Sequence, residues 1–257
     1  MRTAVRIRPK SSGEVARMRE SGRIVGEVLA RIGERIRPGV TTIELDAFAE
    51  EWIRGRGAQP SFKGYHGFPR SLCVSVNEEV VHGIPARRAL REGDLVTIDC
   101  GALLDGWHGD AARTFAVGAI DAESGELLRV CEGALAAAIE QMRPRRRVGD
   151  VSRAVEEHVK RESGFSVVRQ YVGHGIGRAL HEEPQVPNYF EPGFPFADLV
   201  LEPGHVFAIE PMVNAGTHEV RVLEDLWTVV TADGRRSAHF EHTVAVTEQG
   251  PQVLTLP

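Results

Sequence analysis

The chain has 257 residues, of which 42% are hydrophobic and 26% are charged, and its formal net charge is −5. These values exclude a disulfide-stapled mini-protein and a disordered chain, and they allow one large buried core. No apolar run approaches the ~18 residues of a membrane span, and no apolar leader follows Met1. The net negative charge argues against DNA as a partner. The three cysteines form no CxxC pair, which favours reduced thiols in a cytoplasmic protein.

Two helices are predicted after a short basic segment, residues 1–10. Ser11 and Glu14 have the spacing of a capping box. Apolar residues then recur at helical intervals from 18 to 36, until Pro38 and Gly39 end the pattern. A second capping box in residues 41–44 opens a shorter helix with an apolar face from Leu45 to Trp52.

The rest of the chain mixes strands with two further helices. A helix is predicted over 124–142, and another begins near Asp150 as its N-cap. Two hairpin turns are predicted at Asp105-Gly106 and Asp233-Gly234. Strands are predicted over 72–76, 95–100, 167–172, 206–209, 220–230 and 238–246. We therefore expect an α+β fold in which residues 1–257 form a single catalytic domain.

A weak internal repeat suggests two halves with the same plan. Residues 93–99 and residues 204–210 each run from a glycine through an apolar strand to a carboxylate, Asp99 or Glu210. A His-Gly-Ile sequence precedes each of them, at His82 and at His174. Such halves would place the two carboxylates near a pseudo-twofold axis. Over so few residues, chance similarity is the alternative.

The first predicted hairpin places two carboxylates together. If residues 105 and 106 form a two-residue turn, position 99 faces position 112, and Asp110 lies diagonally across from Asp99 on the same face. Both carboxylates could then reach one cation. The alternative is that Asp99 caps a turn and Asp110 is a solvated loop acid.

Three further residues strengthen the case for a metal site. Glu210 and Glu241 are embedded in apolar strand patterns, where a carboxylate requires a partner. His174 lies in a glycine-rich turn, although a histidine there could be purely structural. Four carboxylates and one imidazole suit Mn, Fe(II), Co or Zn. Two ions would balance the charge, and a hydroxide bridging them serves hydrolysis.

These residues lie within motifs that follow one another along nearly the whole chain. The motifs are GYHGFP at 64–69, SVNE at 75–78 with HGIP at 82–85, Ile98-Asp99 with Gly109-Asp110, GHGIG at 173–177 with HEEP at 181–184, IEPM at 209–212 and FEHT at 240–243. The ordered set resembles the type I methionine aminopeptidases of the pita-bread fold. Glu210 follows His174 by 36 positions, a spacing too short for the insertion of type II members.

The resemblance implies a role for each matching residue. The implied metal ligands are Asp99, Asp110, His174, Glu210 and Glu241, with two divalent ions as cofactors. His82, His181 and Glu210 would be catalytic. A metal-bridging hydroxide would attack the first peptide bond, and Glu210 would accept its proton as general base or hold the nucleophile in line. His181 would donate a hydrogen bond to the developing oxyanion, and His82 would contact the scissile amide nitrogen or assist the leaving amine. The implied substrate-binding residues are His82 and His181 together with Phe62, Tyr65, Phe68, Cys73, Leu180 and Trp227. The substrate would be the N-terminal methionine of a nascent protein whose second residue is small.

Some residues depart from the family pattern or keep a second interpretation. His239, Leu226 and His205 stand where Gln, Gly and an apolar residue are commoner. Cys73 could be a small core residue, and His242 could either orient Glu241 or be an exposed strand residue. Residues 143–147, which are RPRRR, are a solvated turn or a transient ribosome contact.

The family also suggests a monomer that acts in the cytoplasm without a membrane. Two rival functions remain. A related peptidase would cleave Xaa-Pro bonds, but such enzymes usually carry a sizeable N-terminal domain before the ligands. A metal-free binding module would lack several of the five ligands, and all five are present here.

Overall fold

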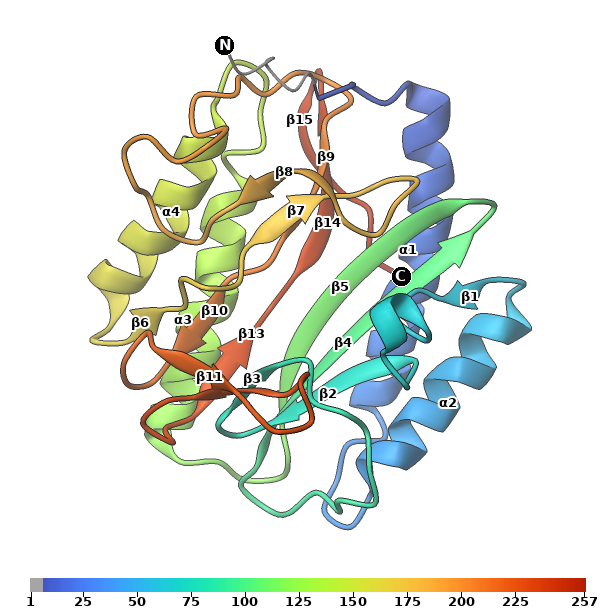
Figure 1. The fold of residues 1–257 in the computed structure, drawn as a ribbon, viewed down its shortest axis with the longest axis vertical. Helices are drawn as coiled ribbons and strands as arrows, with labels where there is room; N and C mark the ends of the chain where they lie inside the picture. The colour runs from blue at the N-terminus through green and yellow to red at the C-terminus, as the bar shows by residue number, and fades with distance from the viewer. Residues whose placement is uncertain (1–6) are drawn as a thin grey trace.

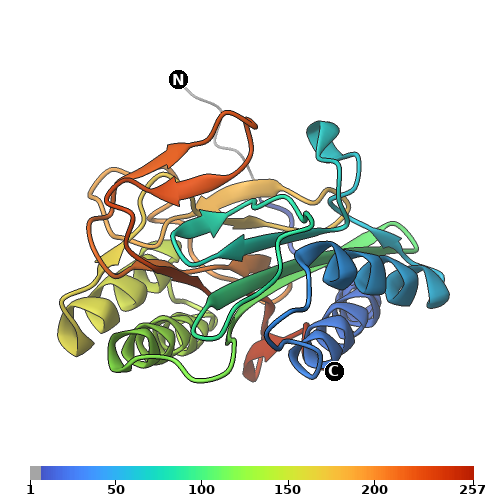
Figure 2. The same ribbon diagram turned by 90° about the horizontal axis from the view of Figure 1, so that it is seen from below.

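The computed structural model describes residues 7–257, so residues 1–6 of the predicted basic segment lie outside the described part. Four α-helices lie together on one side of the described chain, and the strands form the other side (Figures 1 and 2). The helices are α1 (Ser12–Gly33), α2 (Thr42–Gly55), α3 (Ala122–Ile139) and α4 (Val148–Glu162). None of the helices in residues 7–257 is long and apolar enough to cross a membrane.

All of the strand pairs are antiparallel, and the strands form four small sheets. The first contains β1 (Gln59–Pro60), β2 (Leu72–Val76), β4 (Leu95–Leu104) and β5 (Trp107–Ala116). The largest contains β7 (Gly173–Gly175), β8 (Glu182–Val186), β9 (Val206–Ile209), β14 (His242–Thr247) and β15 (Gly250–Val253). The other two contain β6 (Ser166–Val167), β10 (Met212–Asn214) and β13 (Ser237–His239), and β3 (Glu79–Val81), β11 (Val220–Val222) and β12 (Val229–Thr231).

The two halves suggested by the repeat each pair helices with strands. Helices α1 and α2 cover β2 and β4 through one apolar core, and helices α3 and α4 cover β9 and β14 through another. Within the described residues, the other sheet face carries no α-helix and only the short 3-10 helix η1 (Tyr65–Gly67) (Figure 2). This is the predicted α+β arrangement of helices over antiparallel strands, and the two cores meet along β5 and β14.

Local sequence rules explain the helix starts. The Ser11–Glu14 and Thr41–Glu44 capping boxes both form, as predicted. The start near Asp150 is wrong in detail. Helix α4 begins at Val148, Arg147 is its N-cap, and Asp150 accepts a hydrogen bond from the Arg147 backbone N–H at 2.9 Å. An acidic residue satisfies a free N–H equally well from the third helical position, so spacing alone placed the cap too late.

The hairpin of β4 and β5 has the predicted register. Asp99 pairs with Ala112, and Gly101 pairs with Asp110. The strand continues past the predicted residue 100 to Leu104, which pairs with Trp107 across the turn. The two carboxylates therefore lie diagonally on one face.

Three strand predictions in the C-terminal third are wrong in extent. Of 167–172 only Val167 is in a strand, 220–230 is the hairpin of β11 and β12, and 238–246 is broken between β13 and β14. The turn at Asp233-Gly234 exists, but the flanking strands β12 and β13 belong to different sheets, so it closes no hairpin. Distant partners decide the extents of β6 and β13, which both pair with β10. In 220–230 the chain instead turns back on itself, so that Val220 pairs with Thr231. Apolar alternation reports neither kind of pairing.

Helix α1 approaches the backbone of its neighbours so closely that only glycine fits at positions 22 and 26. A Cβ atom on Gly22 would lie 2.4 Å from the backbone oxygen of Leu254, and one on Gly109 of β5 would lie 2.7 Å from Gly22 itself. The helix therefore packs on β5 by backbone contact.

This packing predicts opposite effects for two helical glycines. Gly22→Ala is expected to lower the free energy of unfolding by roughly 1–3 kcal/mol, because the added methyl group displaces backbone. Gly125→Ala in α3 has no neighbour within 4 Å. It should instead stabilise the chain by up to ~1 kcal/mol through helix propensity. Urea unfolding of both variants makes the comparison, and equal effects would contradict this account of the packing.

Candidate metal centre

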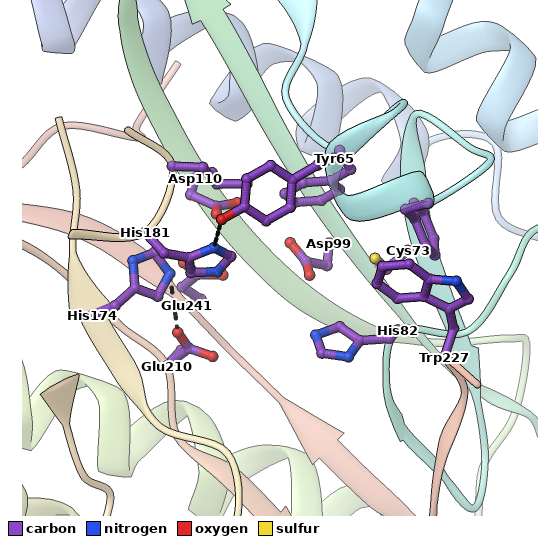
Figure 3. A pocket seen from close by; sticks show the side chains of 13 residues that line it. Tyr65, Cys73, His82, Asp99, Asp110, His174, His181, Glu210, Trp227 and Glu241 are labelled. Atoms are coloured by element: carbon purple, nitrogen blue, oxygen red, sulfur yellow. Dashed lines mark hydrogen bonds and ion pairs between the residues drawn. The ribbon is translucent and has the colours of Figure 1, made fainter. Parts of the chain in front are cut away.

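Strands from both halves bring the five predicted ligands to one place. Asp99 lies on β4, Asp110 on β5 and His174 on β7, whereas Glu210 directly follows β9 and Glu241 lies between β13 and β14. Their side chains face a common space on the sheet side that the helices leave free (Figure 3). Residues far apart in sequence thus meet because antiparallel strands from the two halves adjoin.

Three of the five residues offer atoms at mutual metal-binding distance. One ligand atom each from Asp110, His174 and Glu241 lies within 4.8 Å of the others, and all three residues are buried. Asp99 and Glu210 are half-buried and line the same cavity.

The carboxylates are held where their charged forms are unfavourable. Burial raises the pKa of Asp99 to about 7. Burial, and then the neighbouring carboxylates, raise the pKa values of Asp110, Glu210 and Glu241 well above the ordinary range. One oxygen each of Asp99, Asp110 and Glu241 is buried with no hydrogen-bond partner within the described residues. Such a cluster requires positive charge.

The imidazole of His174 presents a free lone pair to the cluster. Its Nδ1–H donates to the carbonyl oxygen of Gly175 at 2.9 Å, which leaves Nε2 unprotonated. Burial lowers the pKa of His174 to about 3, so the ring is neutral. Nε2 lies 3.5 Å from Oε1 of Glu210. The lone pair of Nε2 and the Glu210 carboxyl group are close enough to contact one shared cation. The donor set, rich in oxygen with one imidazole, fits divalent Mn, Fe, Co or Zn.

A cavity of about 150 Å³ opens beside the carboxylates. Its lining is the complete set of residues that the sequence predicted: Phe62, Tyr65, Phe68, Cys73, His82, Asp99, Asp110, His174, Leu180, His181, Glu210, Trp227 and Glu241. The cavity has a carboxylate and histidine end and an apolar end, where the rings of Phe68 and Trp227 meet edge to face at 5.1 Å.

Two more histidines lie between those ends. His181 is solvent-exposed, and its Nδ1 lies 2.7 Å from the hydroxyl of Tyr65. Partial desolvation of the ring within the cavity, and then the nearby His66, lower the pKa of His181, and burial lowers the pKa of His82 to about 4. Both rings are therefore neutral at pH 7 and each carries one N–H donor.

The comparisons with known proteins follow this geometry. The model of metallopeptidase family M24 matches residues 16–248. The chain belongs to this family. It is 51% identical over 247 residues to the methionine aminopeptidase of Clostridium perfringens, covering 96% of this chain and 98% of that protein. It is also 51% identical over 246 residues to methionine aminopeptidase 1 of Bacillus subtilis, at the same coverage.

Comparison with solved structures supports the same family assignment. Methionine aminopeptidase from Thermotoga maritima superimposes with a TM-score of 0.94 at 45% identity, covering 98% of this chain and all of that chain. Prolidase from Pyrococcus furiosus shares the fold, with a TM-score of 0.78 at 24% identity, and this chain spans 65% of its length. The chain is therefore an M24 member of the methionine aminopeptidase group with the pita-bread fold that the sequence suggested.

Several residues that hold this M24 site in place were not found from the sequence. The Thr243 hydroxyl accepts from the backbone N–H of Asp110 and donates to its carbonyl oxygen. The backbone N–H of Glu241 donates to the carbonyl of Ala112 at 2.8 Å. The Asn188 side chain donates to the carbonyl of Glu210. Partners this remote in sequence, 133 residues apart for Thr243 and Asp110, leave no local pattern.

The three departures from the family pattern lie in different surroundings. His239 is buried with its Nε2 3.9 Å from Oε2 of Glu210. Leu226 is 82% exposed, with a φ of 65° that favours glycine. His205 lies away from the cavity, where its Nδ1 accepts from the backbone N–H of Glu202.

His242 and the arginine-rich segment 143–147, for which the sequence left two interpretations, both have side-chain partners in the structure. His242 is half-buried, and its Nδ1 bonds with the hydroxyl of Thr255 at 2.8 Å. It is therefore not an exposed strand residue. Within residues 143–147, Arg143 pairs with Glu140 and Arg147 pairs with Asp198 between helices α3 and α4.

The raised pKa of Asp99 predicts a pH-dependent effect of Asp99→Asn in metal-free protein. The folded carboxyl keeps its proton to about pH 7, whereas its ordinary pKa is 3.8. Asp99 therefore costs stability progressively as the pH rises from about 4 to about 7. In thermal unfolding with chelator, the variant should be more stable than the parent at pH 8 and equal to it at pH 4. Asp105→Asn, in the exposed turn of the same hairpin, is the control. A less stable Asp99→Asn variant at pH 8 would contradict the buried-charge interpretation.

Proposed function

We propose that this protein removes the N-terminal methionine from polypeptides by metal-dependent hydrolysis, preferring substrates whose second residue is small. The observation that carries the proposal is the pairing of a buried carboxylate and histidine cluster with an apolar, aromatic-lined cavity. Membership in metallopeptidase family M24 supports the reaction class, and the relatives named methionine aminopeptidase support methionine as the residue removed. We further propose that residues 1–257 act as one catalytic domain.

In this proposal Asp99, Asp110, His174, Glu210 and Glu241 hold two divalent ions. Asp99 on β4 and Glu241 before β14 would supply carboxylate oxygens to this cluster from opposite halves. Ions bound there would lower the pKa of a water molecule and polarise the scissile carbonyl. The charge of the carboxylates and the free lone pair of His174 support this ligand set.

The protein side chains then divide the proton transfers. Glu210 accepts a proton from the attacking water as general base. Nδ1 of His181 lies 2.7 Å from the Tyr65 hydroxyl; when that hydroxyl donates, the proton of the neutral ring is on Nε2 and can donate to the developing oxyanion. His82, on the other side of the cavity, contacts the scissile amide nitrogen and assists the leaving amine.

The apolar end of the cavity suits a methionine side chain. Phe62, Phe68, Leu180 and Trp227 would form its walls, with Cys73 as a small, neutral lining residue, because burial raises the pKa of that thiol far above its ordinary value. Contacts between a thioether and aromatic rings contribute about 0.3–1.5 kcal/mol each. They favour methionine over an aliphatic residue of similar length.

The setting of the reaction is also part of the proposal. The substrates would be N-termini of nascent chains in the cytoplasm, met by a monomer. A transient ribosome contact would use Arg145 and Arg146, whose neighbours Arg143 and Arg147 are engaged in ion pairs. Loss of salt-sensitive ribosome co-sedimentation in Arg145→Glu would support this contact, and unchanged binding would remove it.

Three peptides test the function. Metal-stripped protein is incubated with Met-Ala-Ser, Met-Leu-Ser and Ala-Pro-Gly, with and without Mn(II) or Co(II). We expect metal-dependent release of methionine from Met-Ala-Ser, far less from Met-Leu-Ser, and nothing from Ala-Pro-Gly. Cleavage of Ala-Pro-Gly alone would favour an Xaa-Pro peptidase. No cleavage with metal bound would favour a binding module.

The oxyanion role of His181 predicts a specific kinetic change. His181→Ala should lower kcat about 10²–10³-fold with little change in KM, because the lost hydrogen bond forms only in the transition state. Tyr65→Phe should have a smaller effect of the same kind, since it removes only the contact that orients the ring. His66→Ala, an exposed histidine beside Tyr65, is the matched control. A change in KM alone for His181→Ala would rule out the transition-state role.

A further inference from the structure

Two buried nitrogen atoms beside the metal centre lack hydrogen-bond partners. Both ring nitrogens of His239, Nδ1 and Nε2, are unpaired within the described residues, and the side chain is only 2% exposed. Buried polar side-chain atoms are normally hydrogen-bonded, so a residue that leaves two of them unpaired requires an explanation. None of the roles above uses this histidine.

The backbone of His239 is held firmly, so the direction of its ring is set by the fold. Its N–H donates to the hydroxyl of Thr114 at 2.9 Å, and its carbonyl accepts from the same hydroxyl at 2.8 Å. As the last residue of β13, it also pairs with Met212 of β10. These contacts leave the imidazole directed toward Glu210, with Nε2 3.9 Å from Oε2.

Glu210 consequently lies between two imidazoles that differ in their free atoms. Oε1 faces Nε2 of His174. This nitrogen carries a lone pair and no proton, because the Nδ1–H of the same ring donates to the carbonyl oxygen of Gly175. Oε2 faces His239, whose Nδ1 has no such acceptor within the described residues. The proton of His239 is therefore free to lie on Nε2. Oε1 of Glu210 therefore faces an acceptor, Nε2 of His174, whereas Oε2 faces a ring nitrogen of His239 that can act as a donor.

We propose that His239 is a positioning residue for the metal centre: its Nε2–H donates to Oε2 of Glu210 and holds Oε1 toward the ion shared with His174. The proposal rests on the proposed function, in which Glu210 and His174 bind one ion. Nε2 of His239 and Oε2 of Glu210 are 3.9 Å apart, which is too far for a hydrogen bond. In this proposal the two side chains move closer together when the ions bind. Outer contacts of this kind orient metal ligands and typically change affinity 10–100-fold when they are removed.

Metal binding by three variants tests the proposal. Chelator-stripped His239→Leu, His239→Gln and His205→Leu are titrated with Mn(II) and with Co(II) by calorimetry. We expect His239→Leu to bind one ion 10–100-fold more weakly. His239→Gln should stay within a few-fold of the parent, because its amide retains an N–H donor. His205→Leu, a buried histidine away from the cavity, should bind normally. Parent-like affinity of His239→Leu would overturn the proposal.

Thermal unfolding of the metal-free variants separates positioning from a structural role. His239→Leu removes two unpaired buried nitrogens, so its Tm without metal should equal or exceed that of the parent. A lower Tm with unchanged metal affinity would mean that the ring serves packing alone, and it would overturn the proposal.

Two further outcomes are distinguishable. If His239→Gln loses as much affinity as His239→Leu, and X-ray absorption of the Co(II)-loaded parent shows two imidazole ligands, His239 is a direct ligand and the positioning role is wrong. If the parent binds ions and His239→Leu binds them more weakly, but the loaded parent releases no methionine from Met-Ala-Ser, the proposed function fails while the positioning role stands.

Discussion

The burial of several carboxylates around one small space is the constraint on which this structure depends. Burial raises the pKa of Asp99, Asp110, Glu210 and Glu241, and neighbouring carboxylates raise the pKa values of the last three further. One oxygen each of Asp99, Asp110 and Glu241 has no hydrogen-bond partner within the described residues. Such a cluster is unfavourable in an apolar interior without cations. The fold therefore trades stability of the metal-free chain for a preorganised binding site.

That site also explains how the two halves are joined. The backbone bond from Glu241 to Ala112 and the two bonds of Thr243 with Asp110 connect the C-terminal half to the β4–β5 hairpin within a few residues of the ligands. The ligands consequently cannot move relative to one another without breaking backbone contacts. Rigid strands, rather than flexible loops, hold the chemistry, and this suits a reaction that depends on preorganised charge.

Local pattern was sufficient wherever the deciding contacts are close in sequence. The capping boxes of α1 and α2, the strand β9 and the register that sets Asp99 diagonal to Asp110 all follow from spacing within about ten residues. The motifs, in family order, were sufficient for the cavity lining as well. Some wrong predictions, such as a hairpin at Asp233-Gly234, concern strands whose partners are distant in the chain, whereas the late start predicted for α4 is a local error at its N-cap.

The sequence alone thus determined which residues line the cavity and which family the chain belongs to, because side-chain identity and motif order are local properties. Only the tertiary structure decided that Gly22 must lack a side chain and that the Thr243 hydroxyl forms two hydrogen bonds with the Asp110 backbone. It also decided that the His239 ring faces Glu210 at 3.9 Å. These are meetings between segments that lie up to 232 residues apart, from Gly22 to Leu254. Close packing of remote strands and helices creates them, and no spacing rule within the chain encodes them.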